Sequence, residues 1–450
     1  MDLDAIFKAY DVRGLVPSQL DEEAARRIGS GFARFAGVDR IAIGHDCRVS
    51  SPALTNALIE GVTGRGVGVI ALGQITTDML YQVAGALDVP GVVVTASHNP
   101  AQYNGLKFCL GGAVPVGVDS GLAEVKSFAA DPEPEWTGPT GIVTGHDPVP
   151  GYLEHVFGIV RPDAISPLRV AVDGGNGMAG LVVPAVAEIA GIDLTGLYLE
   201  PDGTFPNHPA DPLDPANLVD LVAVMERGNH DLGIAFDGDA DRAFFVDDTG
   251  SPLSGSTVTA LVAEWYLRRE PGAAIVHNLI CSRAVAETVL AAGGRPVRTR
   301  VGHSYIKQTM AETGAVFGGE HSGHYYFRDH YRADSGILAG LVLMQILSEG
   351  GVRLSELRSR YEPYAASGEI NLSVGDKKAV LDTAAGAFPE AAVDRLDGVT
   401  VEWPDRWFNM RPSNTEPFVR LNVEASNGQA VEELVREVRA IVESEEMTRQ

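Results

Sequence analysis

The amino-acid sequence predicts an α/β protein with several related units and a smaller α+β unit at its C-terminal end. Short β-branched runs alternate with helix-like segments over most of the 450 residues, which is typical of sheets covered by helices. Three of these runs, at Ile41, Val170 and Ile275, each lead through a polar turn into a helix, so we expect three related units. From about Ser367 the pattern changes to alternating strands and one final helix, Ala430 to Glu443.

The first unit illustrates the alternation. A helix is expected to begin at Ser18 or Asp21, either of which can cap it, and to end at about Ala36. Apolar runs predict the strands that follow. In chain order, the further expected elements are a strand at 40–44, a helix at 51–64 and strands at 66–72, 91–95 and 104–108.

A proline-rich segment and two further strand openings divide the chain. Residues 131–150 contain five prolines and several acids, which is typical of a linker. Strands at 168–172 and 274–279 begin the next units. The first of these enters a glycine-rich turn without GxGxxG spacing, so a plain turn is favoured over a phosphate cradle. We therefore predict domains at 1–145, 146–252, 253–365 and 366–450.

The composition indicates a globular protein without nucleic-acid or membrane partners. Hydrophobic residues make up 45% and charged residues 21% of the chain. With 35 Lys and Arg against 60 Asp and Glu, the net charge of −25 repels nucleic acid and anionic membranes. An anionic substrate therefore needs a local basic pocket. The apolar run Ile337 to Leu347 is too short to cross a bilayer and predicts a buried helix.

Cysteine usage and the N-terminus favour a cytoplasmic protein. Cys47, Cys109 and Cys281 are far apart and form no CxxC motif, which argues against structural zinc and a disulfide framework. The acidic start, Met1 to Ala5, lacks the basic and apolar pattern of a signal peptide. We expect a monomer or weak dimer in a reducing compartment.

A candidate nucleophile follows the third predicted strand. The apolar run from Gly91 ends on Thr95-Ala96-Ser97-His98-Asn99-Pro100, where small polar residues and a proline stop regular structure. Ligands of α/β proteins commonly bind beyond the ends of core strands, so the hydroxyl of Ser97 can act as a nucleophile or phosphate carrier. An ordinary loop serine is the simpler interpretation of this segment taken alone. Lys107, on the next strand, is placed to return toward Ser97.

Three carboxylates at alternate positions form the most informative motif. Asp237, Asp239 and Asp241 follow an apolar run. Clustered carboxylates repel one another, so they need a cation or a basic partner, and they suit a hard divalent cation. An EF-hand calcium loop fits poorly because Arg242 and Asp248 stand where that loop needs glycine and glutamate. The motif predicts a magnesium site rather than a solvated acidic turn, and Arg242 can hold a phosphate oxygen.

Two polar loops follow predicted strands further along the chain. They are Val301-Gly302-His303-Ser304 and Gly318-Gly319-Glu320-His321-Ser322-Gly323-His324. Two histidines and a glutamate raise the alternative of zinc, but the HExxH spacing is absent and the glycines break any helix. Glu320 and Ser322 can exchange hydrogen bonds with sugar hydroxyls. Taken alone, each segment is also consistent with a plain polar loop.

Two arginine-containing segments are candidates for phosphate contacts. Near the C-terminus, Arg411-Pro412-Ser413-Asn414-Thr415-Glu416-Pro417 collects an arginine, two hydroxyls and an amide, a set that suits a phosphate dianion. A capped surface turn is an equally good interpretation of that segment by itself. At the N-terminus, Tyr10 and Arg13 flank a turn, and a guanidinium fork suits phosphate as well. A solvated surface arginine near a core tyrosine is an equally good interpretation of these two residues.

Together, four of these segments resemble the α-D-phosphohexomutase superfamily, and within it the bacterial phosphomannomutase/phosphoglucomutase group. They occur in the order and approximate spacing of that family over the whole chain. The segments that carry the resemblance are Thr95 to Pro100, Asp237 to Arg242, Gly319 to His324 and Arg411 to Thr415. The resemblance implies three related α/β domains with mixed sheets, plus a smaller α+β C-terminal domain, around a central cleft.

The resemblance also implies a reaction. The family interconverts mannose 1-phosphate and mannose 6-phosphate, and glucose phosphates, through a phosphoserine enzyme and a hexose 1,6-bisphosphate that also serves as activator. It implies Mg²⁺ held by Ser97, Asp237, Asp239 and Asp241. The implied catalytic residues are Ser97, His98, Lys107, Arg242 and His303. The implied substrate-binding residues are Tyr10, Arg13, Gly302, His303, Glu320, Ser322, Arg411, Ser413, Asn414, Thr415 and Arg420.

Alternatives within and outside this chemistry stay open at this point. A phosphoglucosamine mutase differs by one residue of the sugar loop, where this chain has His321. Ile280 stands where many relatives carry a lysine that contacts substrate. A magnesium-dependent phosphatase, in which water intercepts the phosphoserine, and a non-catalytic sugar-phosphate sensor are the alternatives of other classes. The sensor is disfavoured because Ser97 and the three aspartates are all present.

Overall fold

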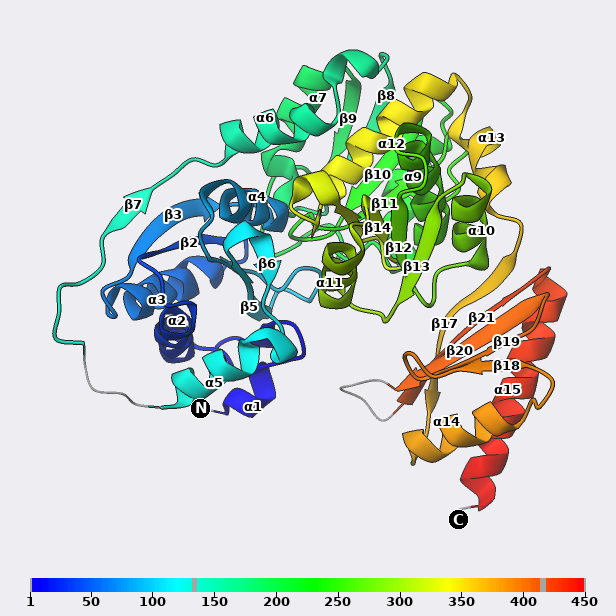
Figure 1. Cartoon of the computed structure of the whole chain (residues 1–450). Helices are drawn as coiled ribbons and strands as arrows, with labels where there is room; N and C mark the ends of the chain where they lie inside the picture. Colours follow the sequence, from blue (N-terminus) through cyan, green and yellow to red (C-terminus); the bar gives the residue numbers. More distant parts are fainter. Residues whose placement is uncertain (1, 132–135, 413–417, 449–450) are drawn as a thin grey trace.

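The computed structural model describes residues 2–131, 136–412 and 418–448. In Figure 1 four units follow one another along the chain, from the blue N-terminal unit to the orange and red C-terminal unit, each built on its own sheet. The first three are α/β and the last is a smaller α+β unit. This confirms the predicted fold class.

The first unit contains a mixed sheet. Its elements are α1 (Leu3–Ile6), β1 (Val12–Leu15), α2 (Glu22–Ala36), β2 (Arg40–His45), α3 (Ser51–Thr63), β3 (Gly68–Gln74), α4 (Thr77–Leu87), β4 (Gly91–Val94), β5 (Tyr103–Leu110), β6 (Val114–Pro115), α5 (Leu122–Ala130) and β7 (Val143–Gly145). The strand order is β1-β5-β4-β2-β3-β7, with β6 paired to β5. β4 is fully buried, parallel to β2 and antiparallel to β5, as its β-branched sequence favours. Asp21 caps α2 by accepting from the N–H of Ala24 at 2.8 Å.

The predicted linker is in part a strand. β7 lies within residues 131–150 and pairs in parallel with β3, with Val143 opposite Val69. The interpretation of this whole segment as a linker is therefore wrong for residues 143–145, and also for residues 149–150, where the first helix of the second unit begins. The strand is not evident from the sequence because its neighbours are rich in proline. A short edge strand pairs through its backbone groups, so its side chains need not show a strand pattern.

The second and third units repeat the alternation of strands and helices. The second contains α6 (Val149–Ile159), β8 (Arg169–Asp173), α7 (Val183–Ala190), β9 (Asp193–Leu197), α8 (Val219–Met225), β10 (Leu232–Phe236) and β11 (Ala243–Val246), with strand order β11-β10-β8-β9. The third contains α9 (Gly255–Arg269), β12 (Ala274–Asn278), α10 (Arg283–Ala291), β13 (Arg295–Thr299), α11 (His303–Thr313), β14 (Phe317–Gly319), β15 (Tyr325–Phe327), β16 (Ala333–Asp334), α12 (Gly336–Gly350) and α13 (Leu354–Arg358), with order β13-β12-β14-β15-β16.

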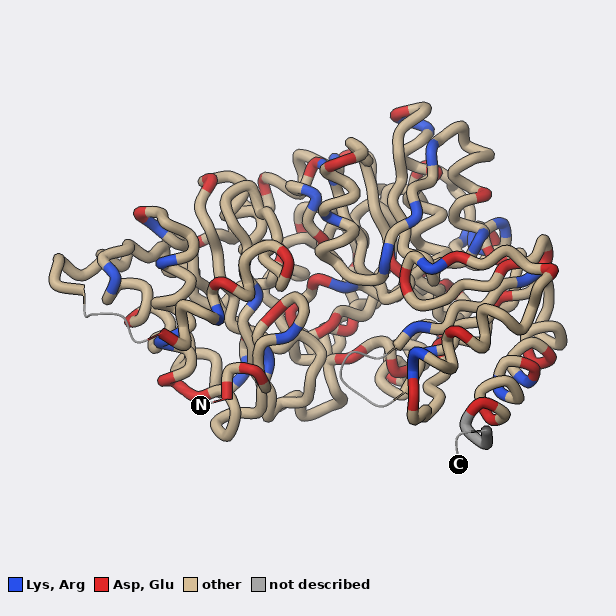
Figure 2. Tube along the Cα trace, turned by 60° about the horizontal axis from the view of Figure 1, so that its bottom comes forward, with Lys and Arg blue, Asp and Glu red and all other residues tan. Residues whose placement is uncertain are grey.

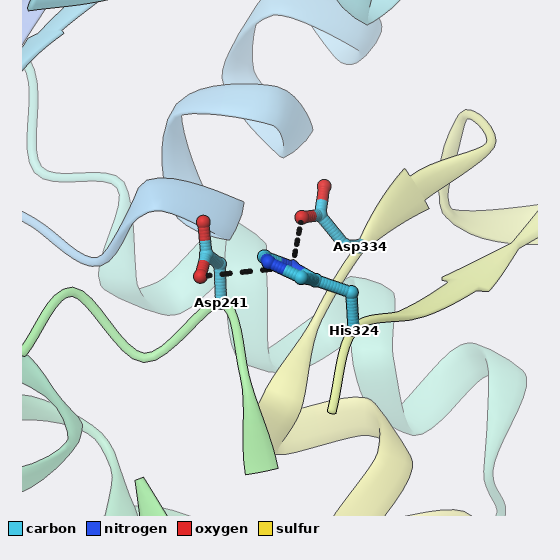
Figure 3. Close-up of side chains that lie close together, drawn as sticks. All are labelled: Asp241, His324 and Asp334. Carbon is cyan, nitrogen blue, oxygen red and sulfur yellow. Dashed lines mark hydrogen bonds and ion pairs between the residues drawn. The ribbon is translucent and has the colours of Figure 1, made fainter. Parts of the chain in front are cut away.

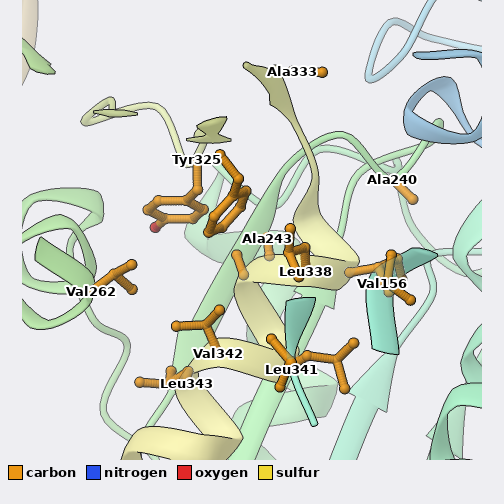
Figure 4. Packing of buried hydrophobic residues seen from close by; sticks show 14 of the residues in the cluster. Val156, Ala240, Ala243, Val262, Tyr325, Ala333, Leu338, Leu341, Val342 and Leu343 are labelled. Carbon is orange, nitrogen blue, oxygen red and sulfur yellow. The ribbon is translucent and has the colours of Figure 1, made fainter. Parts of the chain in front are cut away.

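A single apolar core joins the first three units. It centres on α12, which is buried over most of its length, as its apolar sequence predicts. Figure 4 shows Leu338, Leu341 and Val342 of α12 among side chains of the second and third units, including Ala243 and Val262. In the described part of the chain, no single helix is both long and apolar enough to cross a membrane. Only α12 taken with the sharply bent segment 354–361 meets those criteria of length and composition.

A buried carboxylate ties the same three units together. Asp78, in the first turn of α4, accepts hydrogen bonds from the hydroxyls of Tyr152 at 2.6 Å and Ser335 at 2.5 Å. Tyr152 belongs to α6 of the second unit and Ser335 caps α12 of the third. Burial raises the pKa of Asp78 to about 6, against the opposing effect of its hydroxyl donors. This network fixes how the first three sheets sit relative to one another.

The fourth unit has an antiparallel sheet and a separate core. It contains β17 (Ala365–Ser373), α14 (Lys377–Gly386), β18 (Ala392–Asp394), β19 (Val399–Glu402), β20 (Arg406–Pro412), β21 (Phe418–Ala425) and α15 (Gly428–Thr448), with strand order β17-β21-β20-β19-β18. Its contacts with the third unit include Arg283, whose guanidinium donates to the carbonyl oxygens of Pro404 at 2.6 Å and Trp403 at 3.0 Å. Polar contacts therefore make an important part of this junction.

Acidic residues outnumber basic residues, and both kinds occur along the whole chain. Figure 2 shows Asp and Glu positions throughout the trace of the chain, with Lys and Arg positions between them. The net charge is −25. Such a surface repels anions at long range, so binding of an anion depends on a local group of basic side chains.

Removing the carboxylate of Asp78 tests the network that joins the units. We expect Asp78→Ala to lower the free energy of unfolding by about 2–4 kcal/mol, because buried hydroxyl donors lose their acceptor. The measurement is the midpoint of urea denaturation. Asp163→Ala is the control, because Asp163 is exposed and pairs with its neighbour Arg161. An Asp78→Ala midpoint equal to that of the control contradicts the role of the network.

Candidate active site

Ser97 and Asp237 meet across the boundary between the first two units. Ser97 follows β4 and Asp237 follows β10, and the Ser97 hydroxyl donates to Asp237 Oδ2 at 2.6 Å. Both side chains are buried. Ser97 has a left-handed backbone with φ of 50°, a strained conformation that is common at functional sites. A Cβ on Gly238 would lie 2.4 Å from the carbonyl oxygen of Ser97, so only glycine permits this approach.

Arg48 holds the loop that carries Ser97. Its guanidinium is fully buried and donates to the carbonyl oxygens of Ser97 at 2.7 Å and Asn99 at 2.7 Å. Asp46 fixes the other side of the guanidinium at 3.1 Å. Neither residue is predicted from the sequence. Their only signal is an acid and an arginine directly after the predicted strand at 40–44, where parallel strands of one sheet end at a common edge.

The three predicted carboxylates converge as expected. Ligand oxygens of Asp237, Asp239 and Asp241 lie within 4.8 Å of one another. Lys107 Nζ donates to Oδ2 of Asp239 at 2.7 Å and also to Oδ2 of Asp241. Burial lowers the pKa of Lys107, but the aspartates outweigh it and raise the pKa above the ordinary value. Lys107 therefore returns toward the site, as its position on an antiparallel strand predicts.

These carboxylates fit a divalent cation. Oδ1 of Asp239 and Oδ1 of Asp241 are buried and have no hydrogen-bond partner among the described residues. A buried carboxylate oxygen without a partner is costly, and a hard cation is the ligand that such oxygens prefer. The cluster can therefore hold a metal ion at the Oδ1 atoms, while Lys107 pairs with Oδ2 of Asp239 and Oδ2 of Asp241.

Arg242 places a second positive charge at the serine. Its Nε donates to Asp237 Oδ2 at 3.0 Å, and its Nη2 lies 3.4 Å from the Ser97 hydroxyl oxygen. Burial raises the pKa of Asp237 to about 7, although Arg242 opposes this effect. A negatively charged group attached to the Ser97 oxygen would therefore lie beside the guanidinium of Arg242.

A pocket of about 140 Å³ opens over this group. Its walls come from the first three units, and Arg411 and Arg420 are not among them. The lining residues are Tyr10, Asp11, Arg13, Tyr81, Ser97, His98, Lys107, Asp241, Arg242, His303, His324 and Asp334. Arg13 donates to the side-chain oxygen of Asn99 on the serine loop. The ring of Tyr10 meets that of His303 edge-on, with ring centres 5.1 Å apart.

A second acidic group adjoins the first. Figure 3 shows His324 between Asp241 and Asp334. His324 Nδ1 lies 2.8 Å from Asp334 Oδ2 and 3.9 Å from Asp241 Oδ1, and Lys307 Nζ lies 2.8 Å from Asp334 Oδ1. Burial lowers the pKa of His324, but the two aspartates outweigh it, so the pKa is raised. The sequence marks His324 only as part of a polar loop, and no local pattern marks Asp334 or Lys307.

Glu320 lies in a polar cage in the third unit. It is buried and accepts from Asn278 Nδ2 at 3.0 Å, from the Tyr326 hydroxyl, and from the N–H of Gly302 at 3.4 Å. Gly302 has φ of 135°, and a Cβ there would lie 2.6 Å from the Tyr10 hydroxyl. The two polar loops of the third unit are thus joined through Glu320. Ser322 lies on the same loop as Glu320, between β14 and β15, and is half-buried.

The C-terminal arginines form a separate cluster. Arg411 and Arg420 lie opposite each other on β20 and β21, so Arg411 stands on a strand rather than in the predicted turn. Both contact Glu369. The remaining predicted residues of this segment, Ser413, Asn414 and Thr415, lie outside the described residues.

Two candidate proton carriers are held neutral. Burial first, and then the nearby charges of Arg242 and Arg13, lower the pKa of His98 well below its ordinary value. Burial, with a smaller effect from Lys307, lowers the pKa of His303 to about 3. His98 Nδ1 lies 3.3 Å from the Ser97 hydroxyl oxygen. The single proton of that hydroxyl is donated to Asp237 in this arrangement, so the neutral imidazole of His98 can accept it only when the bond to Asp237 is broken.

Four family models match the chain in order. They describe phosphoglucomutase/phosphomannomutase α/β/α domain I at residues 4–131, domain II at 150–250, domain III at 254–364 and the C-terminal domain at 369–441. The chain belongs to the phosphoglucomutase/phosphomannomutase family. This confirms the resemblance to the α-D-phosphohexomutase superfamily, whose members are isomerases that move a phosphoryl group within a sugar phosphate.

Several curated relatives of this phosphohexomutase span nearly its whole length. A phosphomannomutase of Escherichia coli K12 is 38% identical over 430 residues, covering 93% of this chain and 94% of the relative. A phosphoglucomutase of Neisseria gonorrhoeae is 37% identical over 455 residues, covering 98% and 97%. A solved phosphoglucomutase/phosphomannomutase family protein of Burkholderia thailandensis superposes with a TM-score of 0.91 at 33% identity, covering 99% and 98%.

The protonation of His303 can be followed directly by NMR. Because its folded-state pKa of about 3 lies below the unfolded value, the ring stays neutral from about pH 8 down to about pH 5 and lowers stability only as the pH falls below about 6.5. Its ring signals, assigned by their loss in His303→Asn, should not shift in that range. His208 is the control, because its hydrogen bond to Asp173 raises its pKa. A His303 titration between pH 5 and 8 contradicts the prediction.

Proposed function

We propose that this phosphohexomutase interconverts mannose 1-phosphate and mannose 6-phosphate, and also the corresponding glucose phosphates, with Ser97 as the phosphoryl carrier. The observation that carries the proposal is the Ser97 hydroxyl, held 2.6 Å from Asp237 and 3.4 Å from Arg242 inside a pocket. Relatives named phosphomannomutase and phosphoglucomutase match at 38% and 37% identity, which supports both sugars.

The reaction consists of two phosphoryl transfers. In the first, the bond between phosphorus and the Ser97 oxygen breaks as a free hydroxyl of the hexose phosphate attacks, which gives a hexose 1,6-bisphosphate. In the second, the Ser97 oxygen attacks the other phosphate and releases the isomeric monophosphate. Free hexose 1,6-bisphosphate would restore phosphoserine and so act as an activator. Positioning and charge stabilisation supply most of the catalysis in such transfers.

The residues around Ser97 take separate roles. Arg242 stabilises charge on the transferred group, and His98, His303 or Lys107 carries the proton of the attacking or leaving hydroxyl. Asp237, Asp239 and Asp241, with an oxygen on Ser97, would hold Mg²⁺. When bound, the cation supplies charge neutralisation for the phosphoryl oxygens.

The substrate contacts come from all four units. Tyr10 and Arg13 support the serine loop, and Gly302 with His303 forms the neighbouring wall. Glu320 and Ser322 bind ring hydroxyls. Arg411, Arg420 and the residues Ser413, Asn414 and Thr415 bind the phosphate that is not transferred. We also propose domain boundaries at about 145, 252 and 365, and a monomer or weak dimer in the cytoplasm without nucleic-acid or membrane partners.

Replacement of Ser97 tests the carrier. We expect Ser97→Ala to reduce interconversion of mannose 1-phosphate and 6-phosphate by about 10³-fold or more, because no oxygen remains to carry the phosphoryl group. Intact mass after incubation with hexose 1,6-bisphosphate should show one added phosphoryl group on the unmodified protein and none on Ser97→Ala. Ser166→Ala is the control, because Ser166 bonds Ser348 at the surface. Full activity of Ser97→Ala refutes the proposal.

The same assay separates the alternatives. A mutase yields isomeric sugar phosphate without free phosphate, whereas a phosphatase releases phosphate at the rate of substrate loss. Rates on mannose, glucose and glucosamine 1-phosphates rank the substrates and decide between the proposed activity and a phosphoglucosamine mutase. A sensor would bind these compounds and convert none of them.

Removal of the metal tests the carboxylate cluster. We expect a chelator to abolish interconversion and Mg²⁺ to restore it. By calorimetry, Asp239→Asn should weaken Mg²⁺ binding by about tenfold or more, because one charged ligand is lost. Asp163→Asn should bind Mg²⁺ like the unmodified protein. Equal Mg²⁺ affinity of Asp239→Asn and the unmodified protein contradicts the assignment.

A further inference from the structure

One carboxylate of the fourth unit occupies both C-terminal arginines. Glu369 Oε2 accepts from Arg411 Nη2 at 2.8 Å, and Glu369 Oε1 lies 3.3 Å from Arg420 Nη1. Glu369 is part of β17 and retains about a third of its side-chain exposure. Each carboxylate oxygen therefore serves one guanidinium, and the carboxylate bridges the pair.

The sheet forces the two arginines together. Arg411 and Arg420 are direct cross-strand partners on β20 and β21, an arrangement in which like charges repel unless an anion lies between them. Glu369 lies opposite Asn422 on β21, just after an irregularity in the register between Ala366 and Glu369. That irregularity sets the face on which the Glu369 side chain meets the arginines.

The bridge to Glu369 leaves one nitrogen of each arginine side chain without a hydrogen-bond partner among the described residues. These buried nitrogens are Nε of Arg411 and Nε of Arg420. One carboxylate carries a single negative charge against two guanidinium groups. A phosphate monoester carries a charge of about −1.5 to −2 and more acceptor oxygens, so it satisfies this pair better than Glu369 does.

The strand that carries Glu369 faces the third unit. A pocket of about 360 Å³ is lined by His321 of the third unit and by Gly368 and Asn422, which are the sequence neighbour and the cross-strand partner of Glu369. His321 lies on the loop that carries Glu320, the proposed sugar ligand. The arginine pair with Glu369 is therefore near the part of the site where the sugar is expected.

We propose that Glu369 is a positioning residue that occupies Arg411 and Arg420 while the site is empty and is displaced by the non-transferred phosphate of the substrate. The inference rests on the proposed function: because Ser97 takes part in both transfers, the bisphosphate must turn round between them, so these arginines release one phosphate and accept the other within each cycle. Because Glu369 competes for the same guanidinium groups, it weakens phosphate binding and speeds release.

Binding of inorganic phosphate tests this competition without depending on turnover. In calorimetric titrations of the full-length protein, we expect Glu369→Gln to bind phosphate about three- to tenfold more tightly than the unmodified protein, because the competing charge is gone while the shape is kept. Asp382→Asn is the matched control, since Asp382 pairs with Arg395 on the same unit. The double variant Glu369→Gln/Arg420→Gln should lose the gain.

Steady-state kinetics supply the second measurement. Glu369→Gln should lower KM for mannose 1-phosphate and also lower kcat, because the bisphosphate leaves the arginines more slowly. A residue that merely held the arginines in place would raise KM instead. Phosphate affinity of Glu369→Gln that is equal to or weaker than that of the unmodified protein overturns the inference, including the case in which neither binds phosphate. Failure of the proposed function is a different result, namely no interconversion by the unmodified protein.

Discussion

The contact between Ser97 and Asp237 is the interaction on which the rest of the site depends. It joins a loop of the first unit to a loop of the second through a hydrogen bond of 2.6 Å, between groups far apart in the sequence. The approach is possible because Gly238 leaves room for the carbonyl of Ser97. Arg242 lies 3.4 Å from the Ser97 hydroxyl oxygen, and Lys107 pairs with Asp239 and Asp241 beside this meeting point.

Two buried networks keep that contact in place. The guanidinium of Arg48 donates to four backbone carbonyl oxygens. Three belong to the loop that follows β4, at Ser97, Asn99 and Pro100, and one belongs to the first residue of β5, Tyr103. Asp78 fixes the first unit to the second and third. Both rely on groups removed from water, where hydrogen bonds to charged partners are strong and a lost partner is costly. The serine therefore sits on a rigid support, as the proposed phosphoryl transfer requires.

The sequence predicts those residues of the candidate site that belong to contiguous motifs. The three aspartates alternate after a strand, and Lys107 lies on the strand that follows the serine loop, so both were found. Arg48 and Glu369 were missed because their partners are distant: backbone carbonyls near residue 100 for one, and arginines on two later strands for the other. The strand β7 was missed because its residues read as a linker and its pairing is made by the backbone. Long-range pairing leaves no local pattern.

The fourth unit has a core of its own. Its apolar cluster draws only on residues from Ala365 to Val442, whereas a single cluster runs through the first three units. An antiparallel sheet with two helices and a separate set of buried side chains meets the criteria for an autonomous folding module. During synthesis the shared cluster, which runs from Ala42 to Tyr361, is completed only after the third unit has emerged from the ribosome, whereas the last module can fold from its own residues.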